Sequence, residues 1–89
     1  VIVVTGGNGL IGKAILKKLK SLGAIAINAD INVIDDFRNH EIKLDITNDQ
    51  SIANVITKVI KEYSKIDGWV NSAYLGNDKH PLISLVNIL

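Results

Sequence analysis

The sequence predicts an α/β fold, a partial doubly wound parallel sheet with the element order β-α-β-β-α-β. The first observation is the run Val1–Val4, which is β-branched, lacks polar alternation and is typical of a strand buried on both faces. The second is that two segments of helical periodicity, residues 10–22 and 47–63, alternate with strand-like runs. Such alternation predicts parallel strands, right-handed crossovers and helices on both faces of the sheet.

The first predicted helix runs from Leu10 to Leu22, and Gly23 follows it as a C-terminal cap. A second apolar run, Ala24–Ala29, predicts the next strand, which ends at Asp30. The predicted helix has an apolar face and a solvent-exposed, basic face. The apolar face consists of Ile11, Ala14, Ile15, Leu19 and Leu22, and the basic face consists of Lys13, Lys17, Lys18 and Lys20.

The second half repeats the alternation. The polar link Ile31–His40 is expected to contain one helical turn, and Glu41–Leu44 predicts a short third strand. Thr47 with Gln50 three residues later fits a capping box, which opens a strongly periodic helix. The run Ile66–Ala73 predicts a fourth strand.

Composition excludes several function classes. A chain of 89 residues and 9.7 kDa fits one domain, and the lack of cysteine excludes a disulfide framework or a cysteine metal site. A net charge of +1 and an aromatic share of 4% argue against a nucleic-acid partner. No apolar run approaches the roughly 18 residues of a membrane span. We therefore expect a cytoplasmic protein without a membrane partner.

A glycine-rich loop, Thr5–Gly12, joins the first strand to the first helix. Gly6 can turn sharply, Gly9 lets the backbone approach a pyrophosphate, and Gly12 allows close packing of helix on strand. The N–H groups near Leu10 and Ile11 then face an anion, with help from the helix dipole. A tight structural turn is the alternative, but the flanking strand and helix favour a dinucleotide site and a Rossmann-like half.

The same loop also matches a P-loop. Gly7 and Gly12 have the spacing G-x4-G, and Lys13 follows. A nucleoside triphosphatase needs Ser or Thr next, for Mg²⁺, whereas this chain has Ala14. The missing hydroxyl argues against phosphoryl transfer.

Asp30 bears on the choice of cofactor. It lies eighteen residues beyond Gly12, near the distance at which a carboxylate binds the adenosine ribose. Because a carboxylate repels a 2′-phosphate, Asp30 favours NAD over NADP. Two alternatives stay open: Asp30 caps the following turn, or Arg38 reaches a 2′-phosphate.

With these residues in place, the chain resembles the short-chain dehydrogenase/reductase family. Four features carry the resemblance, in the family's order over residues 1–74: Thr5-Gly6-x-x-Gly9-x-x-Gly12, Asp30, Asp45-Ile46 and Asn71-Ser72-Ala73. The resemblance implies that Asp45 and Ile46 border the adenine, and that Asn71 and Ala73 line the cofactor cleft. Asn71 has an alternative structural role in tying neighbouring strands together.

Departures from the family pattern are also visible. Ser72 and Tyr74 replace the second Asn and the Gly of the family's Asn-Asn-Ala-Gly segment. The glycine spacing is similar to that of the extended branch, which includes sugar-nucleotide epimerases and dehydratases. The stretch Asp67–Tyr74 is similar to oxidoreductases of bacterial surface-polysaccharide and flagellin-modification pathways.

No catalytic or metal-binding residue is assigned. The family uses a Ser and a Tyr with Lys four residues later, whereas Asp67 follows Tyr63 and Asp78 follows Tyr74 at that spacing. Tyr63 belongs to an apolar stripe and is expected in the core. His40 and His80 are isolated in the sequence, and the resemblance implies a small-molecule substrate for the whole protein.

The limits of the chain suggest a division. We expect residues 1–74 to form a dinucleotide-binding half of a longer oxidoreductase, and residues 75–89 to be a truncated apolar tail. The alternative is a non-catalytic product that binds a dinucleotide weakly or not at all. An uncovered edge of the fourth strand would invite pairing with another chain and leave an isolated monomer poorly stable.

Overall fold

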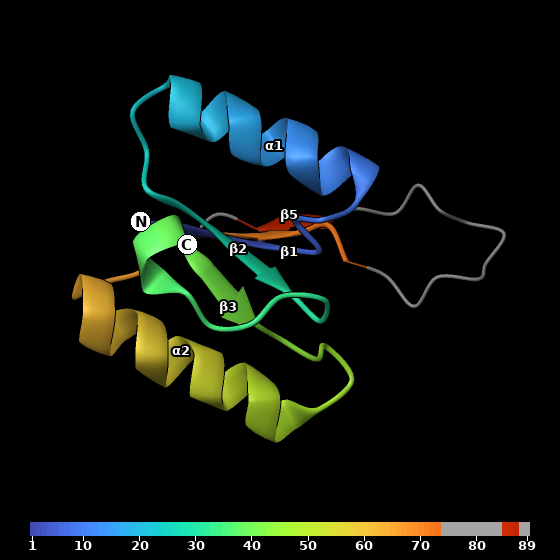
Figure 1. Ribbon diagram of the computed structural model, residues 1–89, viewed down its shortest axis with the longest axis vertical. Helices are drawn as coiled ribbons and strands as arrows, with labels where there is room; N and C mark the ends of the chain where they lie inside the picture. The colour runs from blue at the N-terminus through green and yellow to red at the C-terminus, as the bar shows by residue number, and fades with distance from the viewer. Residues whose placement is uncertain (74–84, 88–89) are drawn as a thin grey trace, which may run out of the picture.

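The computed structural model describes residues 1–73 and 85–87, and it confirms the predicted alternation of strands and helices (Figure 1). The ends of some elements differ from the prediction. The second strand begins at Ala26 and includes Asp30, and the fourth strand is shorter than the predicted run Ile66–Ala73. The elements are β1 (Ile2–Thr5), α1 (Leu10–Ser21), β2 (Ala26–Asp30), the 3-10 helix η1 (Phe37–Asn39), β3 (Glu41–Lys43), α2 (Asp49–Tyr63), β4 (Gly68–Asn71) and β5 (Leu85–Asn87).

The strands form one sheet in the order β3-β2-β1-β4-β5. The first four strands are parallel, as predicted, and β1 lies at the centre with Val3 opposite both Ile27 and Trp69. Neighbouring parallel strands therefore end at the same edge of the sheet, and the loops that follow them gather there.

The expectation of an uncovered β4 edge was wrong, because β5 pairs with β4 in antiparallel register, with Val86 opposite Val70. The unpaired main-chain groups of β4 provide a ladder that a short strand can join. A strand of three residues has no periodicity that the sequence could reveal. The rest of the predicted tail lies outside the described residues.

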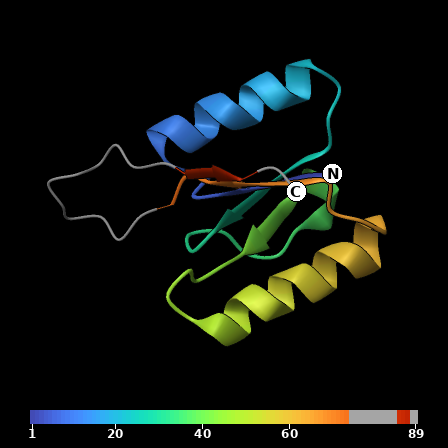
Figure 2. The ribbon, with the colours of Figure 1, turned by 180° about the vertical axis from the view of Figure 1, so that it is seen from behind.

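The two helices lie on opposite faces of the sheet, as Figures 1 and 2 both show. Alternate side chains of the buried strands point to opposite faces, so the sheet divides the core in two. The α2 side holds Val3, Ile27, Ala29, Ile42, Leu44, Val55 and Val59, and the α1 side holds Val4, Leu16, Ala26 and Val70. No helix in the described part of the chain is long and apolar enough to cross a membrane.

The cap of α2 differs from the prediction. Asn48, not Thr47, is the N-cap residue, and its side-chain oxygen accepts a hydrogen bond from the Ser51 N–H at 3.1 Å. Thr47 instead donates its hydroxyl and its N–H to Asp45 Oδ1, at 2.6 and 2.9 Å. Gln50 donates to Asn54 and not back to the cap. The Asp45 carboxylate, a strong acceptor two residues before Thr47, takes the hydroxyl that the capping box would have used.

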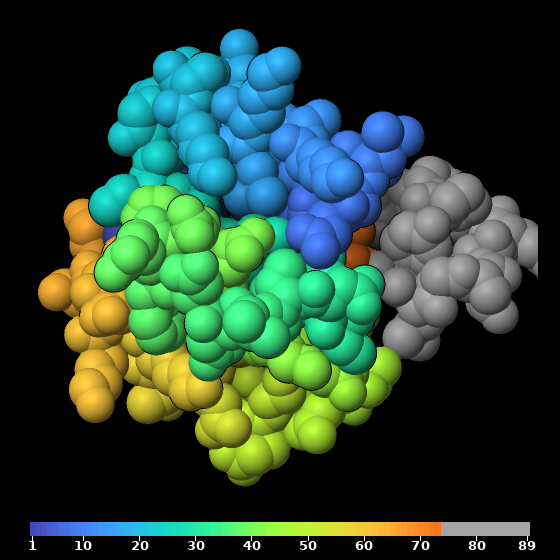
Figure 3. All heavy atoms as spheres, in the orientation of Figure 1, coloured from blue at the N-terminus to red at the C-terminus, as the bar shows by residue number. Residues whose placement is uncertain are grey.

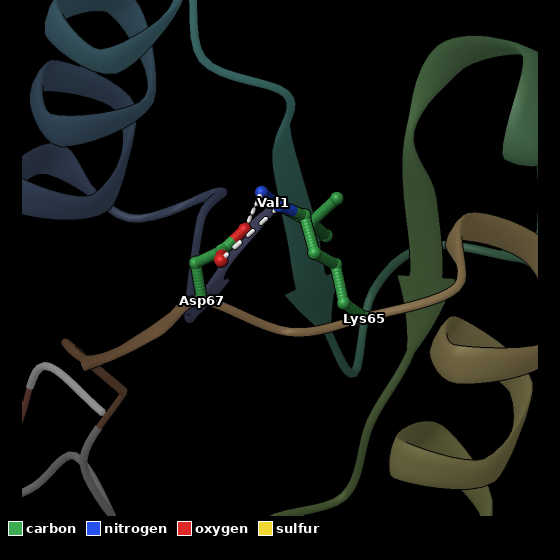
Figure 4. Close-up of polar contacts among 3 residues, drawn as sticks. All are labelled: Val1, Lys65 and Asp67. Carbon is green, nitrogen blue, oxygen red and sulfur yellow. Dashed lines mark hydrogen bonds and ion pairs between the residues drawn. The ribbon is translucent and has the colours of Figure 1, made fainter.

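The amino end of the sheet is closed by side chains. The amino group of Val1 lies 2.7 Å from Asp67 Oδ2, and Lys65 Nζ lies 3.5 Å from Asp67 Oδ1 (Figure 4). At the end of α2, the Tyr63 hydroxyl donates to the Phe37 carbonyl at 3.1 Å and pairs with His40 Nδ1 at 2.9 Å. Because its single proton goes to Phe37, the hydroxyl accepts from the His40 N–H.

Candidate functional site

A cleft of about 400 Å³ lies at the carboxyl ends of the parallel strands. Loops after β1, β2, β3 and β4 form its walls. In open α/β sheets, ligands bind at this edge, where the strand order reverses on either side of the central strand. The lining residues are Gly6, Asn8, Gly9, Ala29, Asp30, Ile31, Asn32, Leu44, Asp45, Ile46, Thr47, Ser72 and Ala73.

The glycine loop packs main chain against main chain. Gly6 has φ +69°, and a Cβ there would come 2.7 Å from Ala73 Cα. At Gly12 a Cβ would come 2.2 Å from the Gly6 carbonyl oxygen. The start of α1 therefore sits on the loop itself, and only glycine fits at these two positions.

Among residues 1–73 and 85–87, no side chain caps the amino end of α1. Its N-cap residue is Gly9, which makes no side-chain capping bond, and no acidic residue occupies the first turn. The first N–H groups of a helix lack intrahelical acceptors, and the helix dipole adds positive potential there. This helix end can therefore receive an anion.

Asp30 ends β2 and is a buried residue, 8% exposed. Its Oδ2 accepts from the Asn8 N–H at 3.0 Å, and its Oδ1 accepts from the Asn32 N–H at 2.9 Å. The carboxylate thus holds the glycine loop on one side and caps the following turn on the other. Each oxygen keeps a second lone pair for a further donor in the cleft.

Asp45 lies on the facing wall, after β3. Hydrogen bonds from the Thr47 hydroxyl and N–H lower the pKa of Asp45 below its usual value. The Asp45 N–H is in turn held by Ser51 Oγ at 3.0 Å. The carboxylate is therefore ionised and held in place at neutral pH.

A buried polar network forms the floor of the cleft. Thr5 Oγ1 accepts from the N–H groups of Ser72 and Ala73, at 3.1 and 3.2 Å. The Ser72 hydroxyl donates to the Thr5 carbonyl. These bonds fasten the segment after β4 to the end of β1, so they set the position of Ala73 against Gly6.

The structure brings six of the residues singled out in the sequence to this cleft: Gly6, Gly9, Asp30, Asp45, Ile46 and Ala73. Leu10 and Ile11 belong to α1 but do not line the cleft, and the Leu10 side chain is 88% exposed. Gly12 supports the loop from below, and Asn71 Oδ1 accepts from Trp69 Nε1 at 2.7 Å. That bond lies within β4, so it does not tie strands together.

Sequence reasoning assigned no cofactor-binding role to several polar residues of the site. Asn8, Asn32, Thr47 and Ser72 line the cleft, and Thr5 supports it from beneath. Each lies at or just after the end of a strand, a position that could have identified them. Lys13 does not line the cleft, which leaves the P-loop interpretation without support here.

Arg38 lies elsewhere. It belongs to η1, which precedes β3 and is held by Tyr63 at the end of α2, so it sits toward the amino end of the sheet. The suggestion that Arg38 reaches a 2′-phosphate in the cleft therefore has no geometric basis. Tyr63 lies at that same end, bonded to Phe37 and His40.

Comparison with known proteins gives consistent matches. A family model described as short chain dehydrogenase matches residues 1–85. The post-translational flagellin modification protein A of Campylobacter coli is 40% identical over 91 residues, which cover 88% of this chain and 36% of that protein. The sorbitol-6-phosphate 2-dehydrogenase of Klebsiella pneumoniae is 39% identical over 77 residues, which cover 82% of this chain and 29% of that protein.

A solved structure shares the fold. A C-terminal deletion mutant of the aldohexose dehydrogenase of Thermoplasma acidophilum matches with a TM-score of 0.71 and 30% identity, over 84% of this chain and 33% of that one. The chain spans about a third of the length of each of these relatives.

Proposed function

Because the chain belongs to the short-chain dehydrogenase family, we propose that it forms the cofactor-binding, N-terminal part of an NAD(P)-dependent oxidoreductase, with NAD as the favoured cofactor. One observation carries the proposal. The cleft at the carboxyl ends of the parallel strands combines a glycine loop, an uncapped helix end and the carboxylates of Asp30 and Asp45. Its volume of about 400 Å³ is within the range of small-ligand sites.

The residues fit the adenosine half of a dinucleotide. The uncapped first turn of α1 suits the pyrophosphate, and the free lone pairs of Asp30 suit the two ribose hydroxyls. Asp45 and Ile46 line the other wall of the cleft, which supports a role for both residues beside the adenine. When bound, the nicotinamide ring supplies hydride transfer.

Asp30 supports the preference for NAD. Its carboxylate lies in the cleft, where it would repel a 2′-phosphate on the same ribose. None of the described residues that line the cleft is a lysine or an arginine, so no cation in the cleft itself offsets that repulsion.

NADH fluorescence tests the proposal on the 89-residue chain. We expect saturable binding, weakened about tenfold by Asp30→Asn, since a hydrogen bond to a charged group contributes about 1.5 kcal/mol. Asn has nearly the shape of Asp, and far-ultraviolet circular dichroism checks that the variant folds. Glu62→Gln makes the same charge change on the exposed surface of α2 and should bind NADH as the parent chain does. No response at millimolar NADH would contradict the proposal.

Catalysis is not assigned to this chain, because the sequence contains no Tyr-x-x-x-Lys pair. A non-catalytic dinucleotide-binding protein is therefore the second candidate, and an assay for NAD reduction by the chain with polyol substrates separates the two. The three-residue glycine spacing keeps an epimerase or dehydratase of the extended branch as a further candidate. An altered sugar product, formed without net reduction or oxidation of NAD, would identify that class.

For the whole protein we infer a polyhydroxylated carbohydrate as the substrate class. Two relatives are named for such substrates, sorbitol 6-phosphate and an aldohexose. We also propose a cytoplasmic location, where NAD is available, and assembly as a homo-oligomer. A substrate panel with the whole protein, and its mass in solution, test these points.

A further inference from the structure

A second concave surface, which we call the lysine groove, lies beside α1 and has a volume of about 430 Å³. One wall is α1 and the other is formed by β2 and the start of β3. Figure 3 shows the blue atoms of α1 facing the green atoms around β3 on this side of the molecule. The lining residues are Gly7, Asn8, Lys13, Leu16, Lys17, Lys20, Asn28 and Glu41.

The groove is positively charged. Helix α1 contains four lysines and no acidic residue, and Lys13, Lys17 and Lys20 line the groove. Their spacing of four and three residues places like charges side by side on one helix face, which destabilises a helix. Lys13 also lies in the first turn, where the dipole disfavours a cation. A bound anion would relieve both effects.

None of these lysines is neutralised by an ion pair in the part of the chain that the structure describes. The ion pairs there join Asp35 to Lys58, and Asp67 to Lys65 and to the amino group of Val1. Glu41 is the single carboxylate among the lining residues, and its Oε2 lies 3.5 Å from Asn28 Nδ2. The lining therefore keeps a net positive charge.

The floor of the groove is held rigidly. Asn28 is 6% exposed, and its Nδ2 donates to Asn8 Oδ1 at 2.8 Å as well as to Glu41. This orientation turns the Asn28 Oδ1 toward Gly7, where no described residue donates a hydrogen bond to it. Asn8 lines the groove and also the cofactor cleft, so the two concave surfaces meet at this residue.

We propose that the lysine groove binds a phosphate monoester. Ammonium groups are compact donors that suit phosphate oxygens, and a dianion matches the excess of lysine over carboxylate. The phosphate has two possible sources. One is the 2′-phosphate of a dinucleotide in the neighbouring cleft, which rests on the proposed function and would reverse the preference for NAD that Asp30 gives. The other is a free phosphorylated metabolite, which does not rest on the proposed function and leaves that preference unchanged.

The first experiment uses inorganic phosphate and NMR on the 89-residue chain. We expect saturable shifts at the amide signals of Asn8 and Asn28, with an affinity that falls about three- to fivefold in Lys17→Ala, the range of one exposed ion pair. Lys18→Ala is the matched control, since Lys18 is the next residue on the same helix, equally charged and exposed, and does not line the groove. Absence of saturable shifts, or an equal loss in both variants, would overturn the proposal.

The second experiment separates the sources with NADH, NADPH, 2′-AMP and 5′-AMP. If the groove takes the cofactor's 2′-phosphate, Lys17→Ala weakens NADPH and 2′-AMP but leaves NADH and 5′-AMP unchanged, and phosphate competes with NADPH. If it takes a free phosphate monoester, phosphate binds equally well with either cofactor present. If NADH fails to bind while phosphate still binds, the proposed function is refuted and the proposal that the lysine groove binds phosphate stands.

Discussion

The two ends of the sheet are built in opposite ways. At the amino end, side chains bond to one another, as in the pairs of Tyr63 with His40 and of Lys65 with Asp67. At the carboxyl end, side chains bond to main-chain N–H groups of the loops, as Thr5, Asp30 and Asp45 do. The bonds to Thr5, Asp30 and Asp45 hold the loops in place around the cleft. We expect ligand binding to respond to changes at one end only.

The largest effect is expected from Gly12→Ala. The new Cβ would lie 2.2 Å from the Gly6 carbonyl oxygen, a backbone atom that can move only with the loop. We expect a loss of about 3 kcal/mol in the free energy of unfolding by overpacking, beyond the gain in helix propensity of about 1 kcal/mol. Urea unfolding measures it. Gly68→Ala is the control, since its Cβ would meet Ile2 at an ordinary 3.5 Å. Equal losses would show that the loop is not tightly packed.

Thr5→Val should rank second. The substitution keeps the shape of the side chain but removes the acceptor of the Ser72 and Ala73 N–H groups. Because buried donors are left without a partner, the free energy of unfolding should fall by about 2 kcal/mol. Since Ala73 lines the cleft, NADH affinity should fall as well. Thr57→Val, on the exposed surface of α2, controls for the change of residue type. Unchanged NADH binding with lowered stability would mean that the network supports the fold without shaping the cleft.

Tyr63→Phe probes the other end. It removes the hydroxyl that links Phe37 to His40 and should cost about 1 kcal/mol, the net contribution of a typical hydrogen bond. The cleft lies at the opposite edge, so the Kd for NADH should not change. A fluorescence titration beside the unfolding curve checks both. A shift in Kd comparable to that of Thr5→Val would refute the separation of the two ends.

The smallest effect concerns pH. The hydrogen bond from Lys58, at 2.8 Å, lowers the pKa of Asp35 below its ordinary 3.8. A lowered folded-state pKa stabilises the protein above the unfolded value, and this stability is lost as the pH falls through the folded value. Asp35→Asn should therefore cost about 0.5 kcal/mol at pH 7, because the pair is exposed, and nothing near pH 2. Unfolding curves at the two pH values test this, and a cost that persists at pH 2 would assign the effect to something other than charge.

Much of the fold was predictable because it is coded locally. The β-branched run at the start, the stripe Ile52–Tyr63 of α2 and the glycine loop each fit a single kind of element. The order of these elements then limits the sheet to parallel strands with helices on both faces. Element ends were less predictable. The sequence favours Thr47 as the cap of α2, but its hydroxyl donates to Asp45, a contact between two loop residues.

The site was predictable in part for the same reason. Residues that follow strands, such as Asp30 and Asp45, meet at one edge in any parallel sheet. The partners of these residues depend on distances between loops, so the role of Asn8 as the joint between cleft and lysine groove could not be seen in advance. The role of Asn28 could not be predicted either, because the sequence shows only a single polar residue within an apolar strand.

By itself, the sequence determined the alternation of strands and helices, the parallel sheet and the edge at which a ligand site forms, because periodicity and glycine placement act over a few residues. Only the tertiary structure decided that β5 covers β4, that Arg38 lies away from the cleft, and which main-chain groups each carboxylate holds. Those outcomes depend on hydrogen bonds between segments that pair only after the sheet has formed.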